Sequence, residues 1–111
     1  VELKNTLVGE RAKVPHLSYI GDAEIGEATN IGAGSITANF PHVPGKPKGR
    51  TTIGRNGRVA VDTMFVAPVT LGDDVWTAAG SVITEDVPDN ALVGFPPRQT
   101  VKEGRGGKRD G

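Results

Sequence analysis

The sequence predicts an all-β fold built from a short repeat, and three observations support this prediction. Large apolar residues recur at every sixth position between residues 53 and 83, with only one exception among Ile53, Val59, Phe65, Leu71, Thr77 and Ile83. Glycine supplies 16 of the 111 residues, as expected of a chain with many tight corners. Aromatic residues make up only 5%, which suits a narrow interior. A period of six matches neither an α-helix nor an alternating strand, so each repeat is expected to be a short strand followed by a corner.

The N-terminal half follows the same period. Val8, Val14 and Ile20 are six residues apart, Ile25 comes one residue early, and Ile31 restores the step. Three faces of six residues give a coil of about 18 residues, whose backbone pairs with the coils on either side. Hexapeptide helices of this kind are left-handed, against the usual hand of crossover connections. We therefore expect a single left-handed parallel β-helix of roughly three and a half coils, with the periodic residues facing inward.

Two segments interrupt the period and divide the chain. Residues 38–50 contain three prolines and no inward pattern, and they are expected to form a loop extruded from a corner, a kind of loop that often carries function. Residues 94–111 are expected to be a flexible, weakly basic tail, and a solvated end is favoured over a binding arm. The predicted domain is the β-helix of residues 1–93.

Composition excludes several classes of function. No apolar run approaches the roughly 18 residues of a membrane span, and 13 basic residues balance 13 acidic ones, so neither a membrane nor a nucleic acid is an expected partner. There are no cysteines and only two histidines, without metal-ligand spacing, so no metal is expected. Asp22, Glu24 and Glu27 are interpreted as solvated corner charges. Glu2 and Lys4 interrupt any apolar leader, so no signal peptide is expected, and the lack of cysteines suits a cytoplasmic location. The missing initiator Met suggests a piece of a longer chain.

Several stretches together resemble a known family: Val1–Asn5, Val14–Ala23, Asn30–Gly34, Asp62–Thr70, Ala78–Gly80 and Glu85–Pro88. They look like the C-terminal part of the bifunctional N-acetylglucosamine-1-phosphate uridylyltransferase/glucosamine-1-phosphate acetyltransferases, over roughly residues 1–93. The resemblance implies a left-handed β-helix that forms a homotrimer, with acetyl transfer in clefts between subunits. The family's nucleotidyltransferase domain has no counterpart in this sequence, nor do several upstream coils that include an arginine for the sugar phosphate.

The resemblance implies transfer of an acetyl group from acetyl-CoA to the amine of glucosamine-1-phosphate, which yields N-acetylglucosamine-1-phosphate for UDP-N-acetylglucosamine and cell-wall precursors. His16 matches the catalytic base, a role suited to a group whose pKa lies near neutral pH. Lys4 matches a residue that binds the sugar phosphate, and Tyr19 and Asn30 match residues that hydrogen-bond the sugar. The alternatives are a surface histidine, an exposed lysine, a wall residue for Tyr19 and a corner residue for Asn30.

Seven positions match the acetyl-CoA side of the family's cleft: Ala33, Asn39, Phe40, Lys48, Val61, Ala79 and Arg98. Asn39 is expected to orient either the thioester or the amine. Lys46 competes with Lys48 as the cofactor lysine, and Arg98 is the nearest candidate for a late arginine. The sequence departs from the family pattern at Val61, where the family has a serine, and in a loop that is three residues longer, with Pro41 and His42 in place of Asp-Gly.

Two alternative functions stay open. The first is a hexapeptide acyltransferase with another acceptor, which the altered loop favours and which Lys4, Tyr19 and Asn30 argue against. The second is a non-catalytic, trimerising β-helix remnant, which Val61 favours because valine cannot supply a serine's hydroxyl. Losing one transition-state hydrogen bond costs roughly 2–4 kcal/mol, so such departures bear directly on activity.

Overall fold

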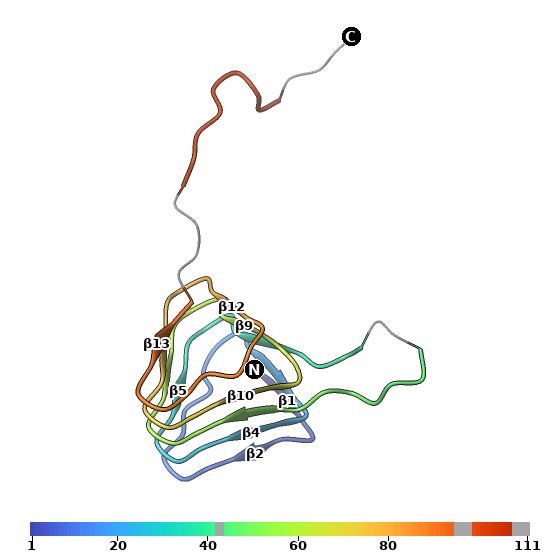
Figure 1. Ribbon diagram of the computed structural model, residues 1–111, viewed down its shortest axis with the longest axis vertical. Coiled ribbons are helices and arrows are strands. Elements are labelled where there is room, and N and C mark those ends of the chain that lie inside the picture. Colours follow the sequence, from blue (N-terminus) through green and yellow to red (C-terminus); the bar gives the residue numbers. More distant parts are fainter. Residues whose placement is uncertain (42–43, 95–98, 108–111) are drawn as a thin grey trace.

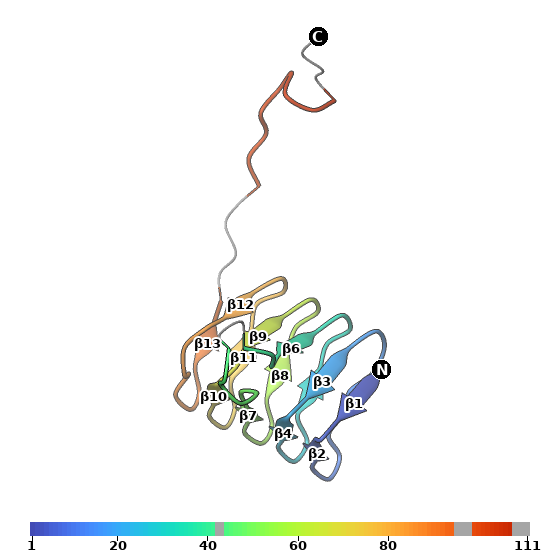
Figure 2. The ribbon, with the colours of Figure 1, turned by 90° about the vertical axis from the view of Figure 1, so that its right-hand side faces the viewer.

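The computed structural model describes residues 1–41, 44–94 and 99–107 of the chain. Within these ranges there is no helix, and thirteen short strands form three sheets in which every pair is parallel. In Figure 1 the chain winds around the three sides of a triangle. Figure 2 shows the successive coils stacked next to one another. The predicted all-β parallel β-helix is confirmed.

Each side of the triangle is one sheet, and we name the sheets A, B and C. Sheet A consists of β1 (Glu2–Lys4), β3 (Tyr19–Gly21), β6 (Ile36–Ala38), β9 (Met64–Val66) and β12 (Val82–Ile83). Sheet B consists of β2 (Leu7–Val8), β4 (Ala23–Ile25), β7 (Thr51–Ile53) and β10 (Val69–Leu71). Sheet C consists of β5 (Asn30–Ile31), β8 (Arg58–Val59), β11 (Trp76–Thr77) and β13 (Leu92–Val93).

The helix has more coils than the sequence led us to expect. Sheet A has five strands, and single bridges from Lys13 to Asn30 and from Leu71 to Val87 add a further rung to sheets C and B. The expectation of three and a half coils was therefore too low. The paired residues Glu2 and Tyr19, in adjacent coils, are 17 positions apart in the sequence, whereas Ile36 and Met64 are 28 positions apart. The whole loop is therefore inserted into a single coil.

The inward positions match the six-residue period. Ile20, Ile31, Ile53, Val59, Phe65, Leu71 and Ile83 are each at most 2% exposed. Full burial of such a side chain contributes about 1.5–3 kcal/mol. Val14 is half-buried and packs against this core, whereas Val8, on the outermost strand of sheet B, is 41% exposed.

Backbone geometry explains both the corners and the slip in the repeat. Residues with positive φ mark the corners, and many are Asn, Asp or Gly, which tolerate this conformation. We call the corner between sheets C and A the histidine corner; its positive-φ residues are Leu17, Gly34, Asp62 and Gly80. The corner between sheets A and B is called the aspartate corner and has Asn5 and Asp22. The corner between sheets B and C is called the outer corner and has Arg11, Ala28, Asn56, Asp74 and Asn90. Asp22 follows Leu17 after five residues instead of six, which accounts for the early Ile25.

The interrupting segment leaves the helix at the aspartate corner, as Figure 1 shows. The N–H of Gly49 donates a hydrogen bond of 2.9 Å to the carbonyl of Asn39 and closes the neck of the loop. Residues 99–107 form no strand, and all are exposed. In the described part of the chain, no helix is long and apolar enough to cross a bilayer.

Candidate active site

Four of the candidate residues lie in one row along the histidine corner. His16, Ala33, Val61 and Ala79 each come directly before the corner residue of their coil. The backbone carbonyls of His16, Ala33 and Val61 each accept a hydrogen bond from a backbone N–H of the next coil, at 3.2, 2.9 and 3.0 Å respectively. Because neighbouring strands lie about 4.8 Å apart, this row spans roughly 14 Å of one edge. The fold thus aligns residues that are up to 63 positions apart in the sequence.

His16 has a fixed backbone and an accessible imidazole. Its carbonyl accepts hydrogen bonds from the N–H of Gly34 and from Ser18 Oγ, both at 3.2 Å. The side chain of His16 is exposed, and so is that of its neighbour Leu17, at 86%. An exposed imidazole on a rigid corner can reach a ligand that lies against this edge.

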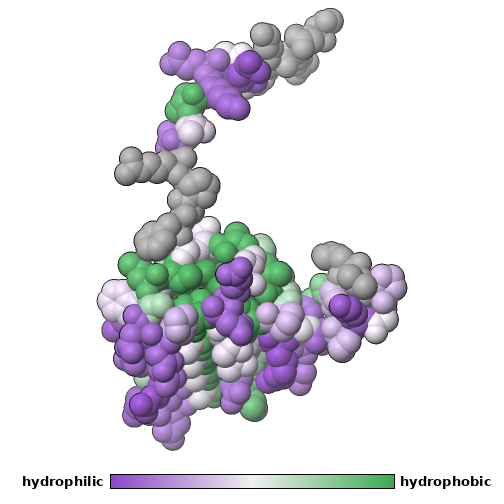
Figure 3. All heavy atoms as spheres, viewed as in Figure 1, coloured by the Kyte–Doolittle hydropathy of each residue, from purple (hydrophilic) through white to green (hydrophobic). Residues whose placement is uncertain are grey.

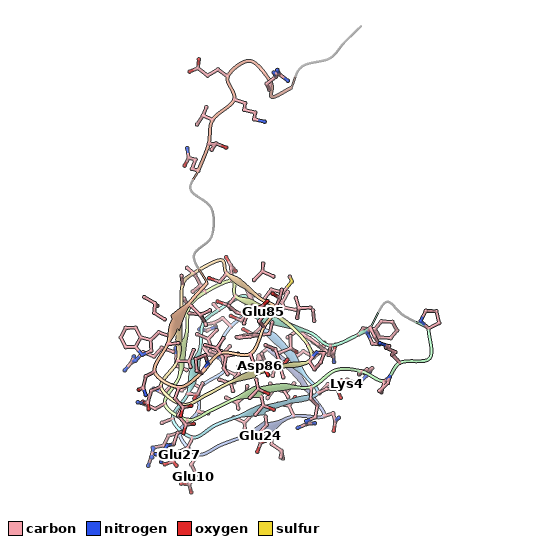
Figure 4. All side chains as sticks on the ribbon, in the orientation of Figure 1. Lys4, Glu10, Glu24, Glu27, Glu85 and Asp86 are labelled. Carbon is pink, nitrogen blue, oxygen red and sulfur yellow. The ribbon has the colours of Figure 1, made fainter. Side chains whose placement is uncertain are left out.

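Lys4, Tyr19 and Asn39 form a second group, on sheet A and its far edge. Lys4 ends β1 beside Gly21, and it lies on the side of the triangle that carries the loop (Figure 4). The side chain of Tyr19 is half-buried, and its hydroxyl lies 3.5 Å from Asn39 Nδ2. A Cβ on Gly21 would clash with the hydroxyl of Tyr19 and would lie 2.7 Å from Asn39 Nδ2. Glycine at this position therefore leaves the space that these two side chains occupy.

The aspartate corner holds a buried carboxylate. Asp22 is only 8% exposed, and its Oδ1 and Oδ2 accept N–H groups from Asn5 and Asn39, each at 2.6 Å. The Asn5 amide holds the pKa of Asp22 below its ordinary value of 3.8, with help from Asn39, Lys48 and Arg50, while burial opposes this shift.

The interpretation of Asp22 as a solvated charge was wrong, whereas Glu24 and Glu27 are exposed as expected, although Glu24 lies on strand β4 and not at a corner. The sequence carried a signal that would have identified this cluster. Asn5, Asp22 and Asn39 are 17 residues apart, which is the length of one coil in this part of the chain. Three polar residues at that interval are placed above one another at one corner.

The loop encloses a pocket next to this corner. The pocket has a volume of about 460 Å³ and is lined by Asn39, Pro41, Lys46, Pro47, Lys48, Gly49, Arg50, Ala67 and Pro68. Both candidate lysines, Lys46 and Lys48, line it, and the ring of Phe40 nearby is 68% exposed. Arg98 lies outside the described residues, as does His42.

Asn30 occupies a different face from the other candidates. It begins β5 in sheet C, it is exposed, and its neighbours in the adjacent rungs are Lys13 and Arg58. The alternative interpretation of Asn30 as a corner residue was therefore wrong. Its side chain points outward from a strand, where a ligand against sheet C can reach it.

Apart from Asn30, the candidates among the described residues lie on sheet A or at one of its two edges. The histidine corner carries His16, whereas the aspartate corner carries Asn39 and the loop. The corner residues Leu17 and Asp22 are five positions apart, which an extended strand covers in roughly 16 Å. A single copy of the chain therefore does not bring His16 and Asn39 into contact with one small group. Among the described residues, no group of three or more His, Cys, Asp or Glu is arranged to hold a metal ion.

The fold is that of the hexapeptide acetyltransferases. Serine acetyltransferase isoform 3 of Entamoeba histolytica, solved with cysteine, superposes with a TM-score of 0.69 and 20% sequence identity, over 89% of this chain and 36% of that one. The serine acetyltransferase of Neisseria gonorrhoeae, solved with serine, gives a TM-score of 0.67 and 20% identity, over 85% and 39% of the two chains. The predicted left-handed β-helix agrees with these structures.

The sequence itself is homologous to the C-terminal region of the bifunctional GlmU proteins. It is 57% identical to the bifunctional protein GlmU of Trichormus variabilis over 104 residues, and 50% identical to that of Mycobacterium tuberculosis over 112 residues. These alignments cover 94% and 100% of this chain, and the chain spans about a fifth (22%) of each relative. No protein-family model matches the chain.

Proposed function

We propose that this chain is a glucosamine-1-phosphate N-acetyltransferase domain that uses acetyl-CoA as its co-substrate. The observation that carries the proposal is the row of His16, Ala33, Val61 and Ala79 along one corner, because four matched positions from four coils share one accessible edge. The identity of 50–57% with bifunctional GlmU proteins supports the choice of acceptor. The serine acetyltransferases support the fold only.

In the proposed reaction, His16 removes a proton from the ammonium or attacking amine of glucosamine-1-phosphate. The amine nitrogen then attacks the carbonyl carbon of the acetyl thioester, a C–N bond forms and the C–S bond breaks. Coenzyme A leaves as the thiol after it receives a proton. Backbone groups at Ala33 and Ala79 line the same edge, where small side chains let a thioester approach closely.

The distribution of the other candidates supports binding roles for them. Lys4 offers a compact positive charge to the sugar phosphate, and Tyr19 lies one coil away on the same sheet. The loop pocket presents Lys46, Lys48 and Arg50, a cationic lining that suits the phosphates of coenzyme A. Of the two lysines, Lys48 is the one whose charge acts on Asp22, the hydrogen-bond partner of Asn39.

We further propose that the active form is a homotrimer. The outward residues Ile36, Met64, Val66 and Val82 of sheet A are large, apolar and 38–60% exposed. Figure 3 shows apolar residues gathered on the side of the triangle near β9 and β12. Burying such a face in an oligomer would remove it from water, and it would let the histidine corner of one copy approach the loop side of another.

One observation favours the non-catalytic alternative. Val61 is 50% exposed on the histidine corner and supplies no hydroxyl at a position where the resembled family has a serine. A trimer that binds acetyl-CoA without transferring the acetyl group would support this alternative.

The deciding experiment measures thiol release from acetyl-CoA with glucosamine-1-phosphate, with serine and with no acceptor. We expect release only with glucosamine-1-phosphate, and Lys4→Ala should raise KM for this acceptor about tenfold while KM for acetyl-CoA changes little. Glu24→Gln, an exposed change on sheet B, is the matched control and should leave both constants unaltered. Release with serine alone would instead assign another acceptor.

Sedimentation in the same buffer tests the trimer. A monomer at tens of micromolar would contradict the proposed intersubunit site. Absent activity in a proven trimer would favour the non-catalytic remnant.

A further inference from the structure

Asp22 is not among the site residues that the family resemblance implies. It nevertheless contacts one of those residues, Asn39, and through Asn39 it adjoins a second, Tyr19. Its Oδ2 accepts the side-chain N–H of Asn39 at 2.6 Å, and Asn39 Nδ2 in turn lies 3.5 Å from the hydroxyl of Tyr19. Asp22 and Asn39 are each 8% exposed. A buried carboxylate with a partner on both oxygens has one arrangement, so its neighbours are held in a defined orientation.

We propose that Asp22 is a positioning residue that fixes the orientation of the Asn39 side-chain amide in the acyl-transfer site. This inference rests on the proposed function. An ionised carboxylate only accepts hydrogen bonds, so it must face the NH₂ group of Asn39 and not the carbonyl oxygen. The pKa of Asp22 lies below its ordinary value of 3.8, so the carboxylate is ionised at neutral pH, where this constraint applies.

This orientation determines what Asn39 can offer to a ligand. Its two N–H groups face Asp22 and the Tyr19 hydroxyl, so the atom that remains is the carbonyl oxygen, which only accepts. A carbonyl oxygen binds an N–H donor, such as the attacking amine, and does not bind the carbonyl oxygen of the thioester. Of the two roles expected for Asn39, the geometry therefore favours orienting the amine. Tyr19, which accepts from Asn39, keeps its own O–H free to donate.

Backbone contacts tie the same residue to three successive coils. The N–H of Asp22 donates to the carbonyl of Lys4 at 2.9 Å, and its carbonyl accepts from the N–H of Thr51 at 3.2 Å. Asn5, which precedes Asp22 by one coil, donates to Oδ1. Asp22 is therefore fixed between Lys4 in one coil and Thr51, the first residue of β7 after the loop, in another.

The outer corner provides a matched control with the same chemistry. Asn56 Nδ2 donates to Asp74 Oδ1 at 2.6 Å, and Asp74, like Asp22, has a positive φ. This pair is exposed and touches none of the candidate site residues. Asp22→Asn and Asp74→Asn are isosteric, and Asn is well tolerated at positive φ, so both variants should fold.

The first test is steady-state kinetics of acetyl transfer with both variants. For Asp22→Asn we expect kcat to fall about tenfold to a hundredfold, since misplacing a positioning group by about 1 Å can cost that much, with both KM values within about threefold of wild type. Asp74→Asn should stay within about twofold of wild type. Equal kcat in the two variants would overturn the proposal. A raised KM for acetyl-CoA at unchanged kcat would overturn the assignment of the Asn39 carbonyl oxygen to the amine of the acceptor. The N–H donor that this oxygen binds would then lie on the cofactor.

The second test does not depend on activity, so it separates this proposal from the proposed function. The side-chain NH₂ of Asn39 is followed by hydrogen exchange in ¹⁵N NMR spectra of the unliganded protein. We expect slow exchange in wild type and in Asp74→Asn, and exchange at least tenfold faster in Asp22→Asn. Fast exchange in wild type would overturn the proposal even if the enzyme is active. Slow exchange in a wild type that lacks activity would support the placement of Asn39 while the proposed function fails.

Discussion

The histidine corner and the aspartate corner border the same sheet, but different groups stabilise them. At the histidine corner, backbone N–H groups bond to backbone carbonyls from coil to coil, and the side chains of His16, Val61 and Ala79 are exposed. At the aspartate corner, side-chain hydrogen bonds between coils add to such backbone bonds, and Asp22 and Asn39 are buried.

This difference determines whether a substitution changes activity, stability or both. A side chain that takes no part in holding its corner can change without a cost in folding, so its effect falls on chemistry. A side chain that bridges coils carries both roles, and its removal leaves a buried partner unsatisfied. We therefore expect substitutions at the two corners to separate activity from stability.

The largest effect is expected at the histidine corner. His16→Ala should lower kcat for acetyl transfer by about two to four orders of magnitude, the range for loss of a general base, while the melting temperature stays within about 2 °C because the imidazole is exposed. Acetyl-CoA affinity, measured by calorimetry, should not change, since the imidazole is assigned to the amine. Equal activity of wild type and His16→Ala would remove the catalytic assignment.

Gly21→Ala should affect both properties at once. The new Cβ would displace the ends of Tyr19 and Asn39, so we expect a loss of about 1–3 kcal/mol in the free energy of unfolding together with a lower kcat. Gly57→Ala is the matched control, because a Cβ there meets nothing closer than 3.4 Å. Urea unfolding compares the two variants, and equal losses would show that the crowding around Gly21 is not what makes this corner sensitive.

Val61→Ser tests the histidine corner by adding a side-chain hydroxyl instead of removing a side chain. If the missing hydroxyl limits turnover, kcat should rise about tenfold, which corresponds to one neutral hydrogen bond of about 1 kcal/mol. Stability should not change, because Val61 is half exposed and its backbone bond to Gly80 stays. Val61→Ala removes the same bulk without adding a hydroxyl, and a rise of the same size in that variant would assign the effect to space.

The smallest effect is expected in the free energy of unfolding at acidic pH. The pKa of Asp22 is lower in the folded protein than its ordinary value of 3.8, so its ionisation stabilises the fold above that pH. This contribution is lost as the pH falls from 3.8 through the folded-state pKa, where Lys48 and Arg50 lose their partner charge. Urea unfolding between pH 7 and pH 3 should show wild type losing stability relative to Asp22→Asn only below about pH 4. A constant difference between the two proteins across this range would contradict the expectation.

The repeat, the inward residues and the extruded loop could all be predicted from the amino-acid sequence alone. A period of six with Ile53, Val59 and Phe65 at one position leaves few ways to bury these side chains, and the three prolines of residues 38–50 cannot continue it. Hydrophobic periodicity is a local property, so it can be seen without coordinates. The candidate residues came from a resemblance, and the alignment of four of them (His16, Ala33, Val61 and Ala79) along the histidine corner follows from the coil length.

The burial of particular polar residues and the edge that each candidate occupies became visible only in the folded chain. Asp22 lies at a corner that Asn5 covers from one coil and Asn39 from another, whereas Glu24, two residues later, lies on strand β4 with its side chain exposed. A short register slip after Leu17 sets the alignment of Asn5, Asp22 and Asn39. The number of coils depended on how many residues the loop removes from one turn. Burial of a charge depends on contacts between distant coils, and such contacts exist only once the backbone has closed each turn of the helix.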